Sequence, residues 1–95
     1  MTSIFAQELK DRLSKGEKPF ILDVRESADA QRSNIGGKNI PNGELPNRIS
    51  EINIPKDSEI IVHCYSGGRS RTAIAFLESQ GFTNCKNLEG GINSY

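Results

Sequence analysis

Two short apolar runs of strand length constrain the fold of this chain more than any other feature. Residues 20–24 read Phe-Ile-Leu-Asp-Val, and residues 59–63 contain Ile60-Ile61-Val62. Runs of this length and composition are typical of strands that are buried on both faces of a sheet. Segments with helical spacing lie before, between and after the two runs. This alternation predicts an α/β fold, with a mostly parallel sheet and helices on its faces.

Apolar spacing and turn residues predict the other elements. The first helix is expected over 3–15, with Ser3 as its N-cap. Phe5, Leu9 and Leu13 recur at helical spacing and are expected on one face of it. Further helices are expected at three segments and short strands at two: 26–31, 45–52 and 70–80, and around Ile40 and over 84–88.

Length and charge exclude several classes of protein. The chain has 95 residues, which predicts one domain over residues 1–95. Its 12 basic and 12 acidic residues cancel, so we expect no nucleic-acid partner. Apolar runs stay far below the roughly 18–20 residues of a membrane span, and we expect no membrane partner. The N-terminal residues lack the basic and apolar regions of a secretory signal, which favours a cytoplasmic location.

The two cysteines, Cys64 and Cys85, do not form a disulfide scaffold or a zinc motif. Without an export signal, two cysteines do not predict a disulfide framework. A zinc site is not expected either, because the sequence has no Cys-x-x-Cys pair and His63 is its single histidine. The sequence therefore predicts no metal.

Cys64 stands in a context that indicates chemistry. It directly follows the buried strand, and the loop after it contains Gly67 and Gly68 and runs into a helix. In an open α/β sheet, ligands bind at this carboxyl edge of the strands. Backbone N–H groups of such a loop can converge on one point, and the helix dipole adds positive potential there. We expect an anion-binding loop in which the glycines supply positive φ angles.

Charges near this loop favour a reactive thiolate at Cys64. Arg69 and Arg71 follow the loop, and the segment 60–77 contains no acidic residue. A positive local field lowers the pKa of a thiol and makes it nucleophilic near neutral pH. Cys64 is therefore the predicted nucleophile, although a lone cysteine at a strand end is ordinarily a small buried apolar residue. Cys85 has no such context and is expected to pack in the last strand.

Three short motifs resemble those of rhodanese-like domains: Asp23-Val24-Arg25-Glu26, Cys64-Tyr65-Ser66-Gly67-Gly68-Arg69-Ser70 and Asn87-Leu88-Glu89-Gly90-Gly91-Ile92. They occur in the order and at the spacing of that family, and the resemblance covers about residues 19–95. It implies a five-stranded parallel sheet flanked by helices on both faces.

The resemblance also implies transfer of sulfane sulfur without an organic cofactor. Cys64 would attack thiosulfate or a related small anionic donor, become a persulfide and release sulfite. Cyanide, a thiol or a protein acceptor would then take the outer sulfur, in ping-pong chemistry. Arg69 would orient the anionic donor. The donor and the persulfide would be bound by the loop residues Tyr65, Ser66, Gly67, Gly68, Arg69 and Ser70.

Asp23 and Arg25 are expected in a supporting role. They lie at the end of the preceding strand, where they would organise the loop rather than touch substrate. A surface ion pair at a strand terminus is the alternative for this pair. Tyr65 and Ser66 are expected at the rim of the pocket, where they would influence the choice of acceptor.

Two other functions compete with sulfur transfer. Protein tyrosine phosphatases also use His-Cys and an anion-binding loop, but their arginine follows the cysteine after five residues. Here that position is Ser70, so phosphatase or arsenate reductase activity ranks lower. The other alternative is a persulfide-carrying or sensing module that serves one dedicated protein acceptor. The presence of Cys64 argues against a purely non-catalytic interaction domain.

Overall fold

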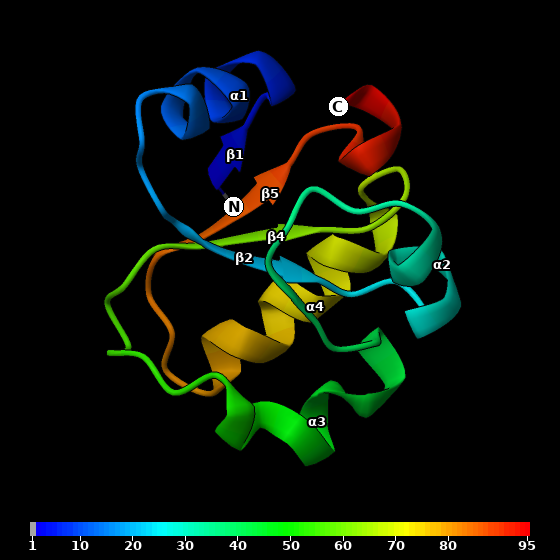
Figure 1. Cartoon of the computed structure of the whole chain (residues 1–95). Coiled ribbons are helices and arrows are strands. Elements are labelled where there is room, and N and C mark those ends of the chain that lie inside the picture. The colour runs from blue at the N-terminus through cyan, green and yellow to red at the C-terminus, as the bar shows by residue number, and fades with distance from the viewer. Residues whose placement is uncertain (1) are drawn as a thin grey trace.

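Parallel pairing joins five strands into one sheet in the computed structural model, which describes residues 2–95 (Figure 1). The prediction of an α/β fold with a parallel sheet is confirmed. The spatial order is β1-β5-β4-β2-β3, so the chain crosses over repeatedly between strands. In chain order the strands are β1 (Thr2–Ile4), β2 (Phe20–Asp23), β3 (Lys38–Asn39), β4 (Ile60–His63) and β5 (Cys85–Leu88).

Helices cover both faces of the sheet. In Figure 1 the helix α1 and the C-terminal turn η3 lie on one side, and α3 and α4 lie on the other. The α-helices are α1 (Ala6–Ser14), α2 (Ser27–Arg32), α3 (Leu45–Arg48) and α4 (Gly68–Ser79). Short 3₁₀ turns occur at η1 (Asn42–Glu44), η2 (Ile49–Glu51) and η3 (Gly91–Ser94).

Strand β4 contributes to a separate core on each face. Ile60 and Val62 belong to the larger core, which includes Ala73 of α4. Ile61 belongs to the smaller core, together with Leu9 of α1. Successive side chains of a strand point to opposite faces, so a strand covered on both sides is apolar at every position. This explains why the run Ile60-Ile61-Val62 is continuous rather than alternating.

The N-terminal segment differs from the expectation of a helix over 3–15. Residues 2–4 form strand β1, which pairs with β5, and Ser3 is therefore not a helix cap. Ile4 is 1% exposed and packs in the smaller core, whereas Phe5 is 65% exposed and does not share the buried face with Leu9. Pairing with the open edge of β5 and burial of Ile4 outweigh a helical pattern that looked continuous in sequence.

Helix boundaries differ from the sequence prediction by a few residues. Helix α4 begins at Gly68 rather than at residue 70, and the helix expected over 45–52 is divided into α3 and η2. Within residues 2–95, none of the helices combines the length and the apolar character that crossing a membrane requires.

The register of the sheet aligns the ends of neighbouring strands. Asp23, the last residue of β2, pairs with His63, the last residue of β4. On the other side of β4, Val62 pairs with Asn87 of β5. The residues that follow these strands therefore gather at one carboxyl edge, where α/β folds bind their ligands.

Two adjacent glycines offer a test of the packing before β3. A Cβ atom at Gly37 (φ 99°) would lie 2.5 Å from the carbonyl oxygen of Ile21, whereas at Gly36 (φ 87°) it would meet nothing within 4 Å. We expect Gly36→Ala to lower the free energy of unfolding by about 1 kcal/mol, through backbone strain alone. Gly37→Ala should cost about 2–4 kcal/mol, because overlap with β2 adds to the strain. Urea unfolding measures both, and equal losses would contradict the close packing.

Candidate active site

Cys64 is the first residue after β4 and lies at the carboxyl edge of the sheet. It is 1% exposed. The backbone N–H of Gly67 donates a hydrogen bond to its Sγ atom at 3.0 Å. Gly67 has φ 109°, a left-handed conformation that glycine adopts without steric cost, and α4 begins at the next residue. The loop therefore folds back over the sulfur. The expected positive φ angle is found at Gly67, whereas Gly68 is the first helical residue.

The environment of Cys64 stabilises its thiolate. Burial acts to raise the pKa of the thiol, but hydrogen bonds from the backbone and hydroxyl of Ser70 and from the backbone of Gly67 and Ser66 outweigh it. The net pKa lies below the ordinary value of a cysteine. Neutral N–H and O–H donors account for this shift, in the way that a backbone nest binds an anion.

Ser70 and Asn87 form a polar support behind the sulfur. The Oγ atom of Ser70 lies 3.6 Å from Cys64 Sγ and 2.9 Å from the carbonyl oxygen of Gly67, and it also contacts Asn87 Oδ1. Both Ser70 and Asn87 are fully buried. A hydroxyl has one hydrogen, so these acceptors and the thiolate compete for it. Asn87 thereby influences how the Ser70 hydroxyl is oriented towards the sulfur.

The sequence alone indicated no role for Asn87. It lies in β5, at a strand position where an apolar residue is expected. A polar residue within a short buried strand needs a buried hydrogen-bond partner, and this could have drawn attention to Asn87 from the sequence.

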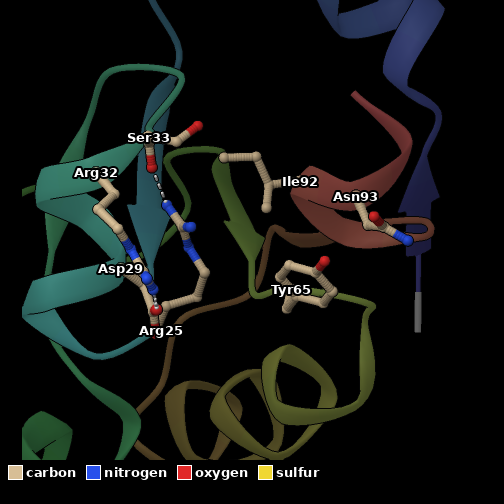
Figure 2. A pocket seen from close by; sticks show the side chains of 7 residues that line it. All are labelled: Arg25, Asp29, Arg32, Ser33, Tyr65, Ile92 and Asn93. Carbon is tan, nitrogen blue, oxygen red and sulfur yellow. Dashed lines mark hydrogen bonds and ion pairs between the residues drawn. The ribbon is translucent and has the colours of Figure 1, made fainter.

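Tyr65 and η3 form one wall of a pocket beside Cys64 (Figure 2). Tyr65 is 56% exposed. The backbone N–H of Ile92 donates to the carbonyl oxygen of Cys64 at 2.9 Å, and that of Asn93 donates to Tyr65 at 3.0 Å. The C-terminal turn is therefore attached to the backbone of the cysteine loop. Tyr65 lines this pocket, whereas Ser66, which was expected beside it at the rim, is exposed and is not among the lining residues.

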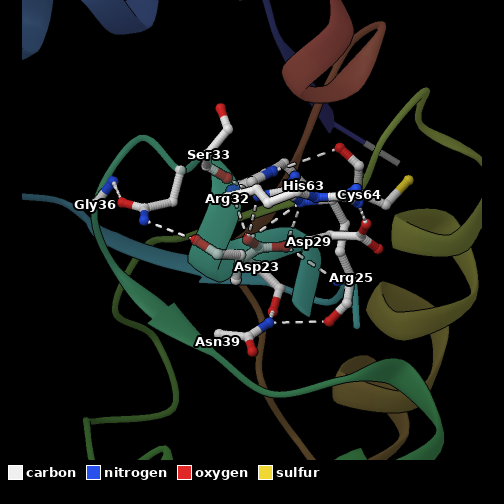
Figure 3. Close-up of polar contacts among 11 residues, drawn as sticks. Asp23, Arg25, Asp29, Arg32, Ser33, Gly36, Asn39, His63 and Cys64 are labelled. Carbon is white, nitrogen blue, oxygen red and sulfur yellow. Dashed lines mark hydrogen bonds and ion pairs between the residues drawn. The ribbon is translucent and has the colours of Figure 1, made fainter. Parts of the chain in front are cut away.

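Asp23 and Arg25 form a buried ion pair, which excludes the alternative of a surface pair (Figure 3). The guanidinium group of Arg25 donates from Nε and Nη2 to the Asp23 carboxylate, at 2.8–3.2 Å. Nη2 also donates to the carbonyl oxygen of Ser33 at 2.6 Å. The two side chains are 2% and 4% exposed. Hydrogen bonds to Asp23 raise the pKa of Arg25, so its charge is fixed.

His63 lies beneath this ion pair. Its Nε2 atom is 4.0 Å from Asp23 Oδ2 and has no hydrogen-bond partner among residues 2–95. Its Nδ1 atom is 3.4 Å from the carbonyl oxygen of Cys64. Burial lowers the pKa of His63, so the ring is neutral near neutral pH. The histidine thus fills space between the ion pair and the cysteine backbone.

The two arginines after the loop were expected to create a positive field with no acidic residue nearby, and the structure differs from this. Arg71 lies 3.6 Å from Glu89, which follows β5 and reaches across from another part of the chain. Arg69 is exposed on the first turn of α4. In the part of the chain that the structure describes, no group of three or more His, Cys, Asp or Glu residues is arranged to hold a metal ion.

Comparison with known proteins agrees with this architecture. A sulfurtransferase of Allochromatium vinosum is 36% identical over 93 residues, which is 97% of this chain and 85% of that protein. The putative sulfur carrier protein YrkF of Bacillus subtilis is 33% identical over 93 residues, which is 97% of this chain and 49% of that protein. This chain thus spans about half of the length of that relative.

A solved structure and a family model match the chain over nearly its whole length. The crystal structure of a rhodanese-like domain protein from Staphylococcus aureus superposes with a TM-score of 0.88 and 28% identity, and it covers 99% of this chain and 90% of that one. The family model described as "Rhodanese-like domain" matches residues 5–95. The resemblance inferred from three short motifs is thereby confirmed, and the chain belongs to the rhodanese-like domain family.

Proposed function

We propose that this protein is a sulfurtransferase that carries sulfane sulfur as a persulfide on Cys64. The observation that carries the proposal is the Cys64 sulfur, buried under a loop whose Gly67 N–H donates to it and whose donors lower its pKa. Similarity to a sulfurtransferase and to a putative sulfur carrier protein supports a sulfurtransferase or sulfur-carrier role. Thiosulfate is the proposed donor, because a small dianion suits a site built from N–H donors.

The proposed reaction has two steps. The Cys64 thiolate attacks the outer sulfur of thiosulfate, a new S–S bond forms, and the old S–S bond breaks with its electron pair leaving on sulfite. Cyanide or a thiolate then attacks the outer sulfur of the persulfide, and the thiolate of Cys64 is restored. The backbone N–H groups that stabilise the thiolate also stabilise the charged persulfide.

A dedicated sulfur carrier is the second candidate function. YrkF, which is described as a putative sulfur carrier protein, matches this chain over half of its own length. A carrier would form the same persulfide but would deliver it to one protein acceptor, with slow turnover to cyanide. Phosphatase chemistry ranks lower, because Ser70 lies behind the sulfur where that chemistry requires an arginine.

Other features of the proposal remain predictions from the sequence. These are a cytoplasmic location, the action of residues 1–95 as one domain, and catalysis without an organic cofactor or metal. The donor-orienting role of Arg69 and the loop-organising role of Asp23 and Arg25 are also part of the proposal.

Replacing Cys64 tests the proposed nucleophile. After incubation with excess thiosulfate, the native protein should gain the mass of one sulfur atom, and cyanide should remove it. Cys64→Ser should show no gain, whereas Cys85→Ser should behave as the native protein because Cys85 is buried in β5. Intact-protein mass spectrometry measures all three. A gain of sulfur in Cys64→Ser would exclude the mechanism.

The pKa of Cys64 determines how its reactivity depends on pH. Its pKa is lowered, so the alkylation rate should rise with pH and level off at a midpoint below the usual value of about 8.5. Ser70→Ala removes a hydroxyl that stabilises the thiolate and should move the midpoint to higher pH. Ser66→Ala is the matched control, because its backbone N–H remains. Burial raises the pKa of Cys85 to about 11, so this thiol should react slowly throughout. Equal midpoints in the two serine variants would contradict the role of Ser70.

Replacing Arg69 tests whether its positive charge helps to bind the anionic donor. Because it is exposed next to the loop, Arg69→Ala should raise the thiosulfate concentration for half-maximal persulfide formation by about three- to tenfold. Arg48→Ala removes the same charge from a different helix, α3, and serves as the control. Rates of sulfite release at several thiosulfate concentrations give both values. If the two variants required the same concentration, Arg69 would have no role in donor binding.

A further inference from the structure

The pocket beside Cys64 has the features of a binding site for an organic anion. It measures about 330 Å³ and lies between α2 and η3 (Figure 2). Backbone hydrogen bonds from η3 attach its wall to Cys64 and Tyr65. The lining residues are Arg25, Asp29, Arg32, Ser33, Tyr65, Ile92 and Asn93.

Arg25 presents an unused hydrogen-bond donor to this pocket. Its Nε and Nη2 atoms are bound to Asp23 and Ser33, whereas Nη1 takes part in none of these bonds. Among residues 2–95, His63 Nε2 is the one fully enclosed side-chain polar atom without a partner, so Nη1 of Arg25 is not fully enclosed. Arg25 lines the pocket, and Figure 2 shows its guanidinium group at the pocket wall. A charged group that is 4% exposed is thus held rigidly by Asp23 with one donor free.

The remaining lining residues define the kind of ligand that fits. Arg32 pairs with Asp29 at the outer side, and its side chain is 78% exposed. Arg25 is paired with Asp23 in the same way, so what it offers to an anion in the pocket is the free N–H of Nη1 rather than an excess of charge. Tyr65 and Ile92 supply carbon surface on the opposite side. The pocket therefore suits a ligand with a negatively charged end and a short carbon body. Thiosulfate is negatively charged but has no carbon body.

We propose that this pocket binds the carboxylate of a small organic thiol, which enters as the acceptor and takes the sulfur from Cys64. This inference rests on the proposed function, because it concerns the second step of that reaction. The carboxylate would accept a hydrogen bond from Arg25 Nη1, and the carbon chain would lie against Tyr65 and Ile92. Cys64 does not itself line the pocket, and the thiol end would extend towards it along Tyr65, the next residue in the chain.

The step that follows balances without any further reagent. The acceptor thiolate attacks the outer sulfur of the Cys64 persulfide and forms a new S–S bond. The S–S bond within the persulfide breaks, and its electron pair returns to Cys64 Sγ. The products are an organic persulfide and the original Cys64 thiolate. The Arg25 charge does not change, so it acts by placing the acceptor.

A matched pair of acceptors tests the proposal. The protein is loaded with thiosulfate, desalted and mixed with 3-mercaptopropionate or with 3-mercaptopropionamide, which has the same shape but no charge. Loss of the persulfide is followed by intact-protein mass spectrometry, and each rate is divided by the thiolate concentration. We expect the carboxylate acceptor to react about three- to tenfold faster than the amide.

Two exposed pocket residues supply the variants. Asn93→Asp introduces a carboxylate with almost no change in shape, and Arg32→Gln removes a positive charge. Each should reduce the preference for the carboxylate acceptor about three- to tenfold. Asn47→Asp on α3 makes the same charge change as Asn93→Asp away from the pocket, and it should keep the native preference. Arg25→Lys retains the charge but removes Nη1, so it should also lower the preference.

The outcomes separate this proposal from the proposed function. Normal persulfide formation with equal rates for the two acceptors would overturn the pocket assignment and leave the sulfurtransferase proposal standing. The same conclusion would follow if Asn93→Asp and Asn47→Asp changed the preference equally. Absence of any persulfide on Cys64 would overturn both. A preference that falls in Asn93→Asp, Arg32→Gln and Arg25→Lys, but not in Asn47→Asp, would establish the pocket as the acceptor site.

Discussion

The parallel pairing of β2 with β4 is the constraint on which the candidate site depends. Asp23 and His63 end these strands in register, so the chain segments that follow them leave the sheet at the same height. One segment carries Arg25 and the other carries Cys64 and Tyr65. A slip of one residue in the register would turn every side chain of the strand to the opposite face. The continuous apolar surface of β4, which fills a core on each side, fixes the position of the strand.

The electrostatics of the site differ from those that its charged residues suggest. The sulfur is stabilised by backbone N–H groups and a serine hydroxyl, whereas Arg71 lies near Glu89 and Arg69 is exposed. Fixed dipoles would suit the proposed conversion of the thiolate to a persulfide, because no side chain would have to move with the charge. The buried arginine of the site, Arg25, is instead bound to Asp23 and faces the pocket.

The sequence predicted the sheet, the position of Cys64 and the loop glycine better than it predicted the surroundings of the sulfur. Continuous apolar runs identify buried strands directly, and a cysteine between such a run and a glycine loop has a recognisable local context. Strand β1 was missed because its three residues gain their strand conformation from pairing with β5, which is distant in sequence. Asn87 and the pocket residues Arg32 and Asn93 were missed for the same reason. Their roles depend on contacts between segments, and no local spacing encodes those contacts.

The arrangement of the two cysteines has a consequence for the fate of bound sulfur. Cys85 pairs with Ile60 at the start of β4, whereas Cys64 follows the end of that strand. At about 3.3 Å per residue, the two cysteines are separated by about 13 Å along the sheet. A disulfide requires Cα atoms within about 7 Å, so Cys85 cannot act as a resolving thiol for Cys64. In the proposed chemistry, Cys85 therefore cannot remove the sulfur bound to Cys64 by forming a disulfide. The lifetime of the persulfide is governed by the molecules that reach the loop from outside.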